Sequence, residues 1–229
     1  MSSYERQSSN SFLLAAREWQ AIGGATGLMI LNVILMYAVA FTPLAGINRI
    51  VFAVPIVGSL VYGAVITVGE LLAERGFKNN TTPLTLVGVV LLEVGFGLFG
   101  GGILSFLAPD VRLLALGVAG VVTAVMTAGI GTYVYARSDT DFDHYGKIAT
   151  GAFLVGLVAI LAGSFISIVL LVGFVAIFLG FLFRLGYEMW EIRENRGLNT
   201  AMQAIGLYVA VAGVFVHILQ LVVRALARR

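Results

Sequence analysis

The amino-acid sequence predicts an all-α integral membrane protein, a polytopic bundle of about seven transmembrane helices with no soluble domain. Two features of the composition predict this fold class. Hydrophobic residues make up 59% of the 229-residue chain and charged residues only 11%, whereas a soluble domain has about 25% charged residues. The mean hydropathy of +0.99 is more than one buried core accounts for. Many apolar side chains are therefore expected to face lipid.

The arrangement of the apolar residues is the third observation, because they lie in stretches of about 20, the length that crosses a bilayer as a helix. Residues 1–20 are more polar and are expected to form a tail with a short interfacial helix over residues 11–20. Residues 21–229 then form a single transmembrane domain. Its seven spans are predicted at residues 21–41, 50–72, 84–107, 113–136, 148–165, 168–190 and 201–226.

The predicted boundaries rest on local breaks in these stretches. The first span stops before Thr42-Pro43, and Pro109-Asp110 separates the third span from the fourth. The fifth and sixth spans nearly touch, which requires a tight turn around Gly163-Ser164. A re-entrant pair at that place is the alternative, and it would lower the number of spans.

Glycine is abundant, with 28 residues in the chain, and four glycines crowd the end of the third span. Small residues let helix backbones approach closely in lipid. Three successive glycines also weaken a helix, so the same segment is a candidate hinge. The glycines with this packing or hinge role are Gly97, Gly100, Gly101 and Gly102.

Lys and Arg are enriched on the cytoplasmic side of membrane proteins, and their distribution favours a cytoplasmic N-terminus. The expected location is a plasma membrane. The basic C-terminal tail argues for the opposite orientation. The N-terminal side is expected to carry Arg6, Arg17, Arg75, Lys78, Arg137, Lys147, Arg193 and Arg196, and the other side Arg49, Arg112, Arg224, Arg228 and Arg229.

Ionisable side chains inside membrane spans are costly, and each is a functional candidate. Arg184 and Glu188 lie four residues apart near the end of the sixth span and are expected to pair. Burial favours a neutral carboxyl and a nearby Arg a charged one. Glu188 is therefore a candidate proton sensor or cation ligand, and an interfacial ion pair is the alternative.

Three further ionisable residues are candidates for an ion path or proton sensing. Glu93 lies near the middle of the third span, where it is expected to be protonated or paired with the helix of Arg184 or His217. Glu70 is either part of the path or an interfacial charge at the end of the second span. His217, in the last span, is either a switch or a hydrogen-bonded packing residue.

Three segments of the second half resemble the Bax-inhibitor family of seven-helix membrane proteins. The first is Ser138-Asp139-Thr140-Asp141-Phe142, followed by Tyr145-Gly146 and Phe153-Leu154-Val155-Gly156-Leu157. The second is Tyr187-Glu188-Met189-Trp190-Glu191-Ile192, and the third is Leu207-Tyr208-Val209-Ala210 with Phe215.

The resemblance implies a pH-sensitive calcium leak in which two acids on the last two helices share a proton. Glu188 stands where the first acid is expected, whereas Ala210 stands where the second is expected. Arg75 falls near the family's basic latch on the second helix. Glu93 and His217 are candidates to replace the missing acid.

The functional expectation is a membrane protein that passes cations through the bundle under the control of buried carboxyls. Its partners are the lipid bilayer, calcium and protons, with membrane-protein partners under the alternative of a non-transporting scaffold or assembly factor. The absence of cysteine and of catalytic motifs argues against an enzyme;. Scattered basic residues argue against nucleic acid. No cofactor is expected beyond weakly bound calcium, and no metal ligands can be assigned.

Overall fold

The computed structural model describes residues 14–53, 55–163, 166–194 and 199–228, and this part of the chain contains helices and no strand. Seven of its helices are long and apolar enough to cross a membrane. The chain is therefore a multi-pass, all-α integral membrane protein, and the predicted fold class and number of spans are confirmed. In order, the elements are α1 (Ala16–Ala40), η1 (Pro43–Gly46), α2 (Ile47–Val51), α3 (Pro55–Lys78), α4 (Thr82–Leu104), α5 (Pro109–Ala136), α6 (Asp143–Gly163), α7 (Ser167–Glu194) and α8 (Thr200–Leu226).

Several helix boundaries differ from the predicted ones. The predicted start of the second span at Ile50 is wrong, because Ile50 belongs to the short helix α2 and α3 begins at Pro55. Pro109 opens α5 in the same way, since proline fits the first turn of a helix;. Residues 16–20 are the first turns of α1, and residues 1–13, including the first part of the expected interfacial helix, lie outside the described residues.

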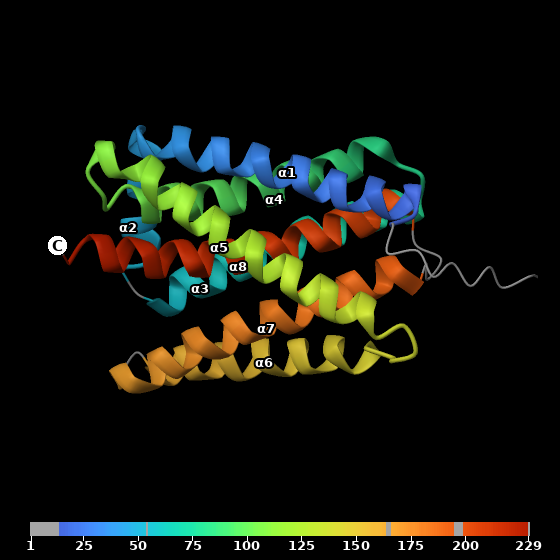
Figure 1. Cartoon of the computed structure of the whole chain (residues 1–229). Coiled ribbons are helices and arrows are strands. Elements are labelled where there is room, and N and C mark those ends of the chain that lie inside the picture. The colour runs from blue at the N-terminus through green and yellow to red at the C-terminus, as the bar shows by residue number, and fades with distance from the viewer. Residues whose placement is uncertain (1–13, 54, 164–165, 195–198, 229) are drawn as a thin grey trace, which may run out of the picture.

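The long helices alternate in direction along the bundle (Figure 1). We call the end of the bundle where α1 begins the proximal end, and the opposite end the distal end. The proximal turn from α3 to α4 is closed by hydrogen bonds from Thr81 N to Gly76 O (2.7 Å) and from Asn80 N to Phe77 O (3.1 Å). Asn80 has a φ of 51°, and asparagine tolerates this left-handed conformation at a helix C-terminus.

Helix α8 is the centre of the bundle and contacts α1, α3, α4, α5 and α7. In Figure 1 it runs between α1 and α4 on one side and the α6–α7 pair on the other. About two-thirds of its apolar stretch is buried (67%), against 22% for α1, α3, α5 and α7. Polar groups that face α8 are therefore shielded from lipid by the surrounding helices.

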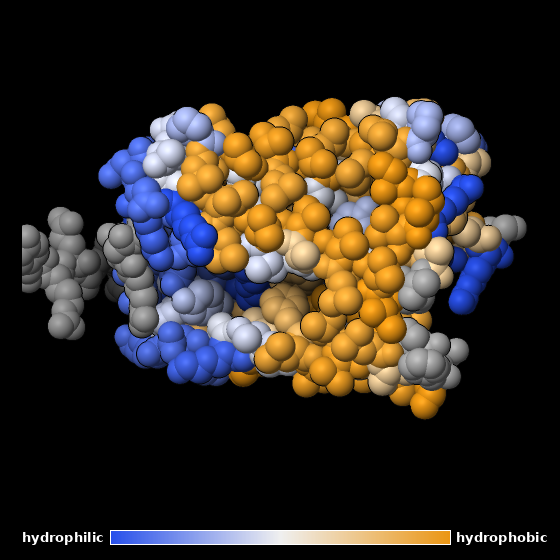
Figure 2. Space-filling model, turned by 180° about the vertical axis from the view of Figure 1, so that it is seen from behind, coloured by the Kyte–Doolittle hydropathy of each residue, from blue (hydrophilic) through white to orange (hydrophobic). Residues whose placement is uncertain are grey.

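The outer surface is apolar around the middle of the molecule. Figure 2 shows a broad hydrophobic band with hydrophilic residues gathered mainly at its two ends. Outward-facing side chains such as Val121 (66% exposed) and Val125 (67% exposed) on α5 contribute to this surface. A lipid environment accounts for such exposure, whereas water would not.

The four glycines predicted for packing or a hinge lie in the unbroken helix α4, and all four are buried. An added Cβ at Gly97 would meet Leu35, and one at Gly101 would meet Val39 and the backbone of Met36. These glycines let α1 lie directly against α4. The face is covered within the chain, so a scaffold role would have to use other surfaces.

Candidate functional site

Three charged side chains from α3 and α7 meet inside the span region. Two nitrogens of Arg184 on α7 donate to the two carboxylate oxygens of Glu70 on α3, Nη1 to Oε2 at 3.2 Å and Nη2 to Oε1. The Arg184 Nε donates to Glu188 Oε1 at 3.4 Å. Bidentate pairing of this kind fixes the relative orientation of the Arg184 guanidinium and the Glu70 carboxylate. The expected Arg184–Glu188 pair is present, but Glu70 is the closer partner of Arg184.

Glu188 is the more buried of the two carboxyls, with 11% of its side chain exposed against 27% for Glu70. Its carboxyl lies against the backbone of Gly206 on α8, where an added Cβ would collide with both carboxylate oxygens. Gly206 therefore makes the space that Glu188 occupies. We call Glu70, Arg184 and Glu188 the charged cluster.

A neutral side chain links three helices on the proximal side of the charged cluster. Gln203 of α8 is 1% exposed. Its Oε1 accepts from Arg17 of α1 at 2.7 Å, and its Nε2 donates to the backbone oxygen of Glu191 in α7 at 3.0 Å. These bonds hold the start of α8 between α1 and α7.

A second polar group lies between α1, α4 and α8, and we call it the Asn32–Glu93–Tyr208 triad. Glu93 is the middle residue of α4 and is 6% exposed. The Asn32 Nδ2 donates to Glu93 Oε2 and to the Glu93 backbone oxygen, both at 2.9 Å. The Tyr208 hydroxyl neighbours the Glu93 carboxyl. Of the two helices expected to supply a partner for Glu93, the helix of His217, α8, does so through Tyr208, and α1 supplies Asn32 in addition.

The two polar groups contact opposite faces of α8. Gly206, which Glu188 touches, and Tyr208, which neighbours Glu93, are two residues apart in this helix. Two residues correspond to about 200° of rotation and about 3 Å along the axis. Glu93 and Glu188 therefore lie at similar depth with α8 between them, and they do not form the paired acids of a shared proton site.

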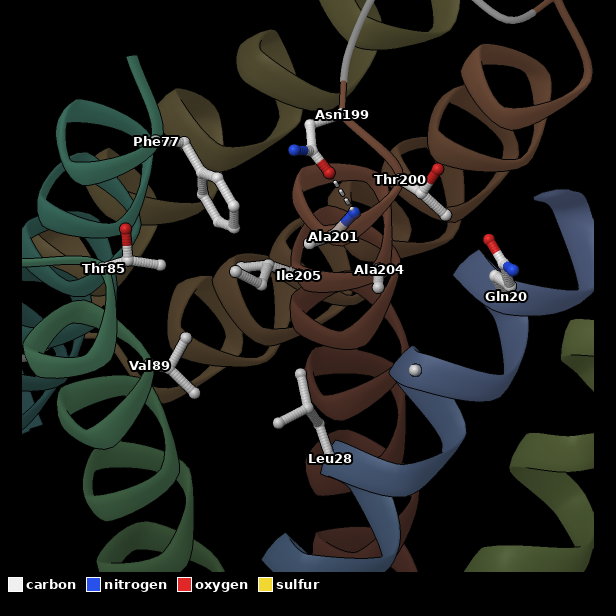
Figure 3. Close-up of a pocket in the computed structure, with 11 residues that line it drawn as sticks. Gln20, Leu28, Phe77, Thr85, Val89, Asn199, Thr200, Ala201, Ala204 and Ile205 are labelled. Carbon is white, nitrogen blue, oxygen red and sulfur yellow. Dashed lines mark hydrogen bonds between the residues drawn. The ribbon is translucent and has the colours of Figure 1, made fainter. Parts of the chain in front are cut away.

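A largely open cavity of about 680 Å³ lies between α1, α3, α4 and α8 at the proximal end. Asn199 caps α8 there by accepting from Ala201 N at 2.9 Å (Figure 3). Leu28 and Val89 line the opposite end of the cavity in the same view. The polar lining residues carry no formal charge: Gln20, Thr85, Asn199 and Thr200.

His217 lies away from both polar groups, nine residues beyond Tyr208 on α8. Its Nδ1 is 2.8 Å from the backbone oxygen of Gly213. Three rings of α7, those of Phe174, Phe178 and Phe181, surround it at centroid distances of 5.0 to 5.7 Å. This environment corresponds to the packing alternative for His217.

Sequence reasoning did not select Asn32, Gln203, Gly206 or Tyr208 as site residues. Asn32 had a usable signal, because it is a lone amide in the apolar run Leu31 to Met36. Gly206 had none, since its role depends on a contact with another helix. Ala210, at the position of the second family acid, is fully buried in α8.

Comparison of the chain with protein-family models, curated proteins and solved structures finds no match. Within the described residues, no three His, Cys, Asp or Glu side chains gather as a metal site would require. The geometry of the two polar groups is therefore the basis for a functional proposal.

Proposed function

We propose that this membrane protein passes cations through its helical bundle, with the charged cluster controlling passage. One observation carries the proposal: inside the span region, two carboxyl groups share a single guanidinium. Charged groups at this depth are costly and mark ion or proton paths in membrane proteins. A purely structural pair would need only one acid for one base.

The cluster has a simple way to respond to protons. With both acids charged, it has a net charge of −1, and Arg184 bridges α3 and α7 through Glu70. Protonation of one carboxyl would remove that charge and weaken its bond to Arg184. Because Glu188 also lies against Gly206 of the central helix α8, such a change would alter the contacts among α3, α7 and α8.

The Bax-inhibitor resemblance supports the same assignment. Glu188 stands at the position of the first acid that the resemblance implies. The position of the second acid is occupied by Ala210, and Glu70 of α3 supplies a second carboxyl instead. The basic group of the cluster is Arg184 of α7 in place of Arg75, which is exposed. Calcium is the cation that the resemblance implies, and we propose a plasma membrane location with the proximal end in the cytoplasm.

The proposal is tested with the full-length protein in proteoliposomes, by measuring calcium and sodium efflux from mildly acidic to mildly alkaline pH. Wild type is expected to show pH-dependent flux, and Glu188→Gln to show flux that no longer changes with pH. Glu74→Gln is the matched control, because Glu74 is one turn from Glu70 and pairs with the exposed Lys78 at the helix end.

Two results would contradict the proposal. Equal pH dependence in wild type and Glu188→Gln would remove the charged cluster from the mechanism. Complete absence of flux in correctly folded wild-type protein would favour the non-transporting scaffold, for which Glu188→Gln should have no effect on partner binding.

A further inference from the structure

The Asn32–Glu93–Tyr208 triad leaves three buried oxygen atoms without a hydrogen-bond partner among the described residues. They are Asn32 Oδ1, Glu93 Oε1 and the Tyr208 hydroxyl. Asn32 and Tyr208 are both 0% exposed. Buried polar groups are nearly always satisfied, and exceptions indicate a missing partner such as an ion. The Tyr208 hydroxyl also faces the Glu93 carboxyl, but none of the three oxygens has a partner with hydrogen-bond geometry, and together they point to a ligand.

The hydrogen bonds of Asn32 determine which atoms face that ligand. Its amide nitrogen is used by Glu93 Oε2 and the Glu93 backbone oxygen. The amide oxygen is therefore the end left free, as is the second carboxylate oxygen. Carboxylate, amide and hydroxyl oxygens together are the donor set of a hard cation.

Charge balance selects the valence of the cation. Glu93 forms no ion pair with a basic side chain in the described chain, and when it is ionised it supplies one negative charge. A monovalent cation makes the site neutral, whereas a divalent cation would leave a buried positive charge uncompensated, which is costly.

The proximal cavity ends one helical turn from the triad, on the same three helices. Leu28, Val89 and Ala204 line the cavity, and each stands four residues before Asn32, Glu93 and Tyr208, respectively. The helices α1, α4 and α8 all run from the proximal to the distal end. Four residues are about one turn, or about 6 Å, so all three triad members lie one turn deeper than the cavity lining.

We infer that Asn32, Glu93 and Tyr208 bind one small monovalent cation of sodium or lithium size, reached from the proximal cavity. Binding does not require passage across the membrane, so the site is tested separately from the flux proposal. Water that enters the cavity completes the coordination of the cation, as is common where a site has few protein ligands.

The test is thermal unfolding of the full-length protein in detergent, titrated with sodium, lithium, potassium or calcium chloride, with choline chloride holding ionic strength constant. Sodium or lithium is expected to raise Tm in a saturable way, because a ligand of the folded state stabilises it. Glu93→Gln is expected to abolish the shift. Tyr208→Phe, which keeps the ring packed on Phe96, is expected to weaken sodium binding by about 5-fold to about 10-fold.

Glu74→Gln is the control, because Glu74 pairs with the exposed Lys78 at the end of α3, outside both polar groups, and the variant should keep the full sodium shift. If Glu93→Gln does not fold, Tyr208→Phe alone decides, since it removes only a hydroxyl. The inference is overturned if no monovalent cation raises Tm above choline, if calcium stabilises more than sodium, or if Tyr208→Phe binds sodium as wild type does.

Discussion

At the scale of single residues, the buried polar side chains of the bundle are held by hydrogen bonds to neutral groups as often as by pairing with charged groups. Glu93 is held by the amide of Asn32, and Gln203 ties Arg17 to the backbone of α7. In lipid, a polar group without a partner is especially costly because no water replaces it.

Asn32→Leu is expected to destabilise the protein by about 1–3 kcal/mol, because the Glu93 carboxyl loses its donor while remaining buried. The double variant Asn32→Leu with Glu93→Met should recover most of this loss, since both polar groups are then gone. Unfolding midpoints of wild type, the two single variants and the double variant form the cycle that measures the coupling. Strictly additive losses would show that the Asn32–Glu93 hydrogen bond contributes nothing.

Gly206→Ala is expected to destabilise the fold by about 1–3 kcal/mol, because its Cβ would meet the Glu188 carboxyl. It should also reduce the pH response of flux, since Glu188 would move away from Arg184. The control is Gly129→Ala on α5, where an added Cβ meets nothing within 4 Å. That change should be neutral or slightly stabilising, as alanine favours a helix over glycine. Equal behaviour of the two variants would contradict the role of Gly206.

At the scale of helices, the sequence predicts that seven spans exist, but it does not predict which spans pack against each other. Hydropathy and length predict each span, because a helix that crosses the hydrocarbon core must be both apolar and long enough to cross it. Most spans have apolar residues around most of their circumference, so their periodicity gives little distinction between a lipid-facing side and a protein-facing side;. Helix α8 has the most one-sided apolar pattern, but that pattern does not say which helices surround it.

The same limit explains which parts of the site were predicted. The Arg184–Glu188 pair followed from their spacing of four residues on one helix. The Glu70–Arg184 and Asn32–Glu93 pairs join residues 114 and 61 positions apart, and only the packing of the bundle brings them together. Local spacing predicts contacts within a helix and is silent on contacts between helices.

The close contact between α1 and α4 depends on the small size of Gly101. Gly101→Leu is expected to cost about 1–3 kcal/mol or more, because even its Cβ would press on Val39 and on the backbone of Met36. The loss should appear as a lower Tm in detergent. Gly117→Leu on α5 is the matched control, since an added Cβ there has open space. A normal Tm for Gly101→Leu would mean that α1 and α4 are not packed as closely as described.

At the scale of the whole molecule, seven spans place the two ends of the chain's transmembrane region on opposite sides of the membrane. Described basic residues near the proximal end are Arg17, Arg75, Lys78, Arg137, Lys147 and Arg193, and those near the distal end are Arg49, Arg112, Arg224 and Arg228. Arg112 donates to the backbone oxygens of Leu107 and Ala40, and Arg193 donates to those of Val134, Arg137 and Thr140, so structural roles account for both of these residues. The remaining imbalance favours a cytoplasmic proximal end.

The orientation can be tested cleanly because the chain has no cysteine, so a single introduced thiol is the only labelling site. Asn79→Cys lies in the exposed proximal turn and Ala108→Cys in the exposed distal turn before α5. A membrane-impermeant maleimide is expected to label Ala108→Cys in intact cells and Asn79→Cys only after permeabilisation. Labelling of Asn79→Cys alone in intact cells would reverse the orientation, and the cavity above the Asn32–Glu93–Tyr208 triad would then face the exterior. Labelling of both before permeabilisation would contradict an odd number of spans between the two positions.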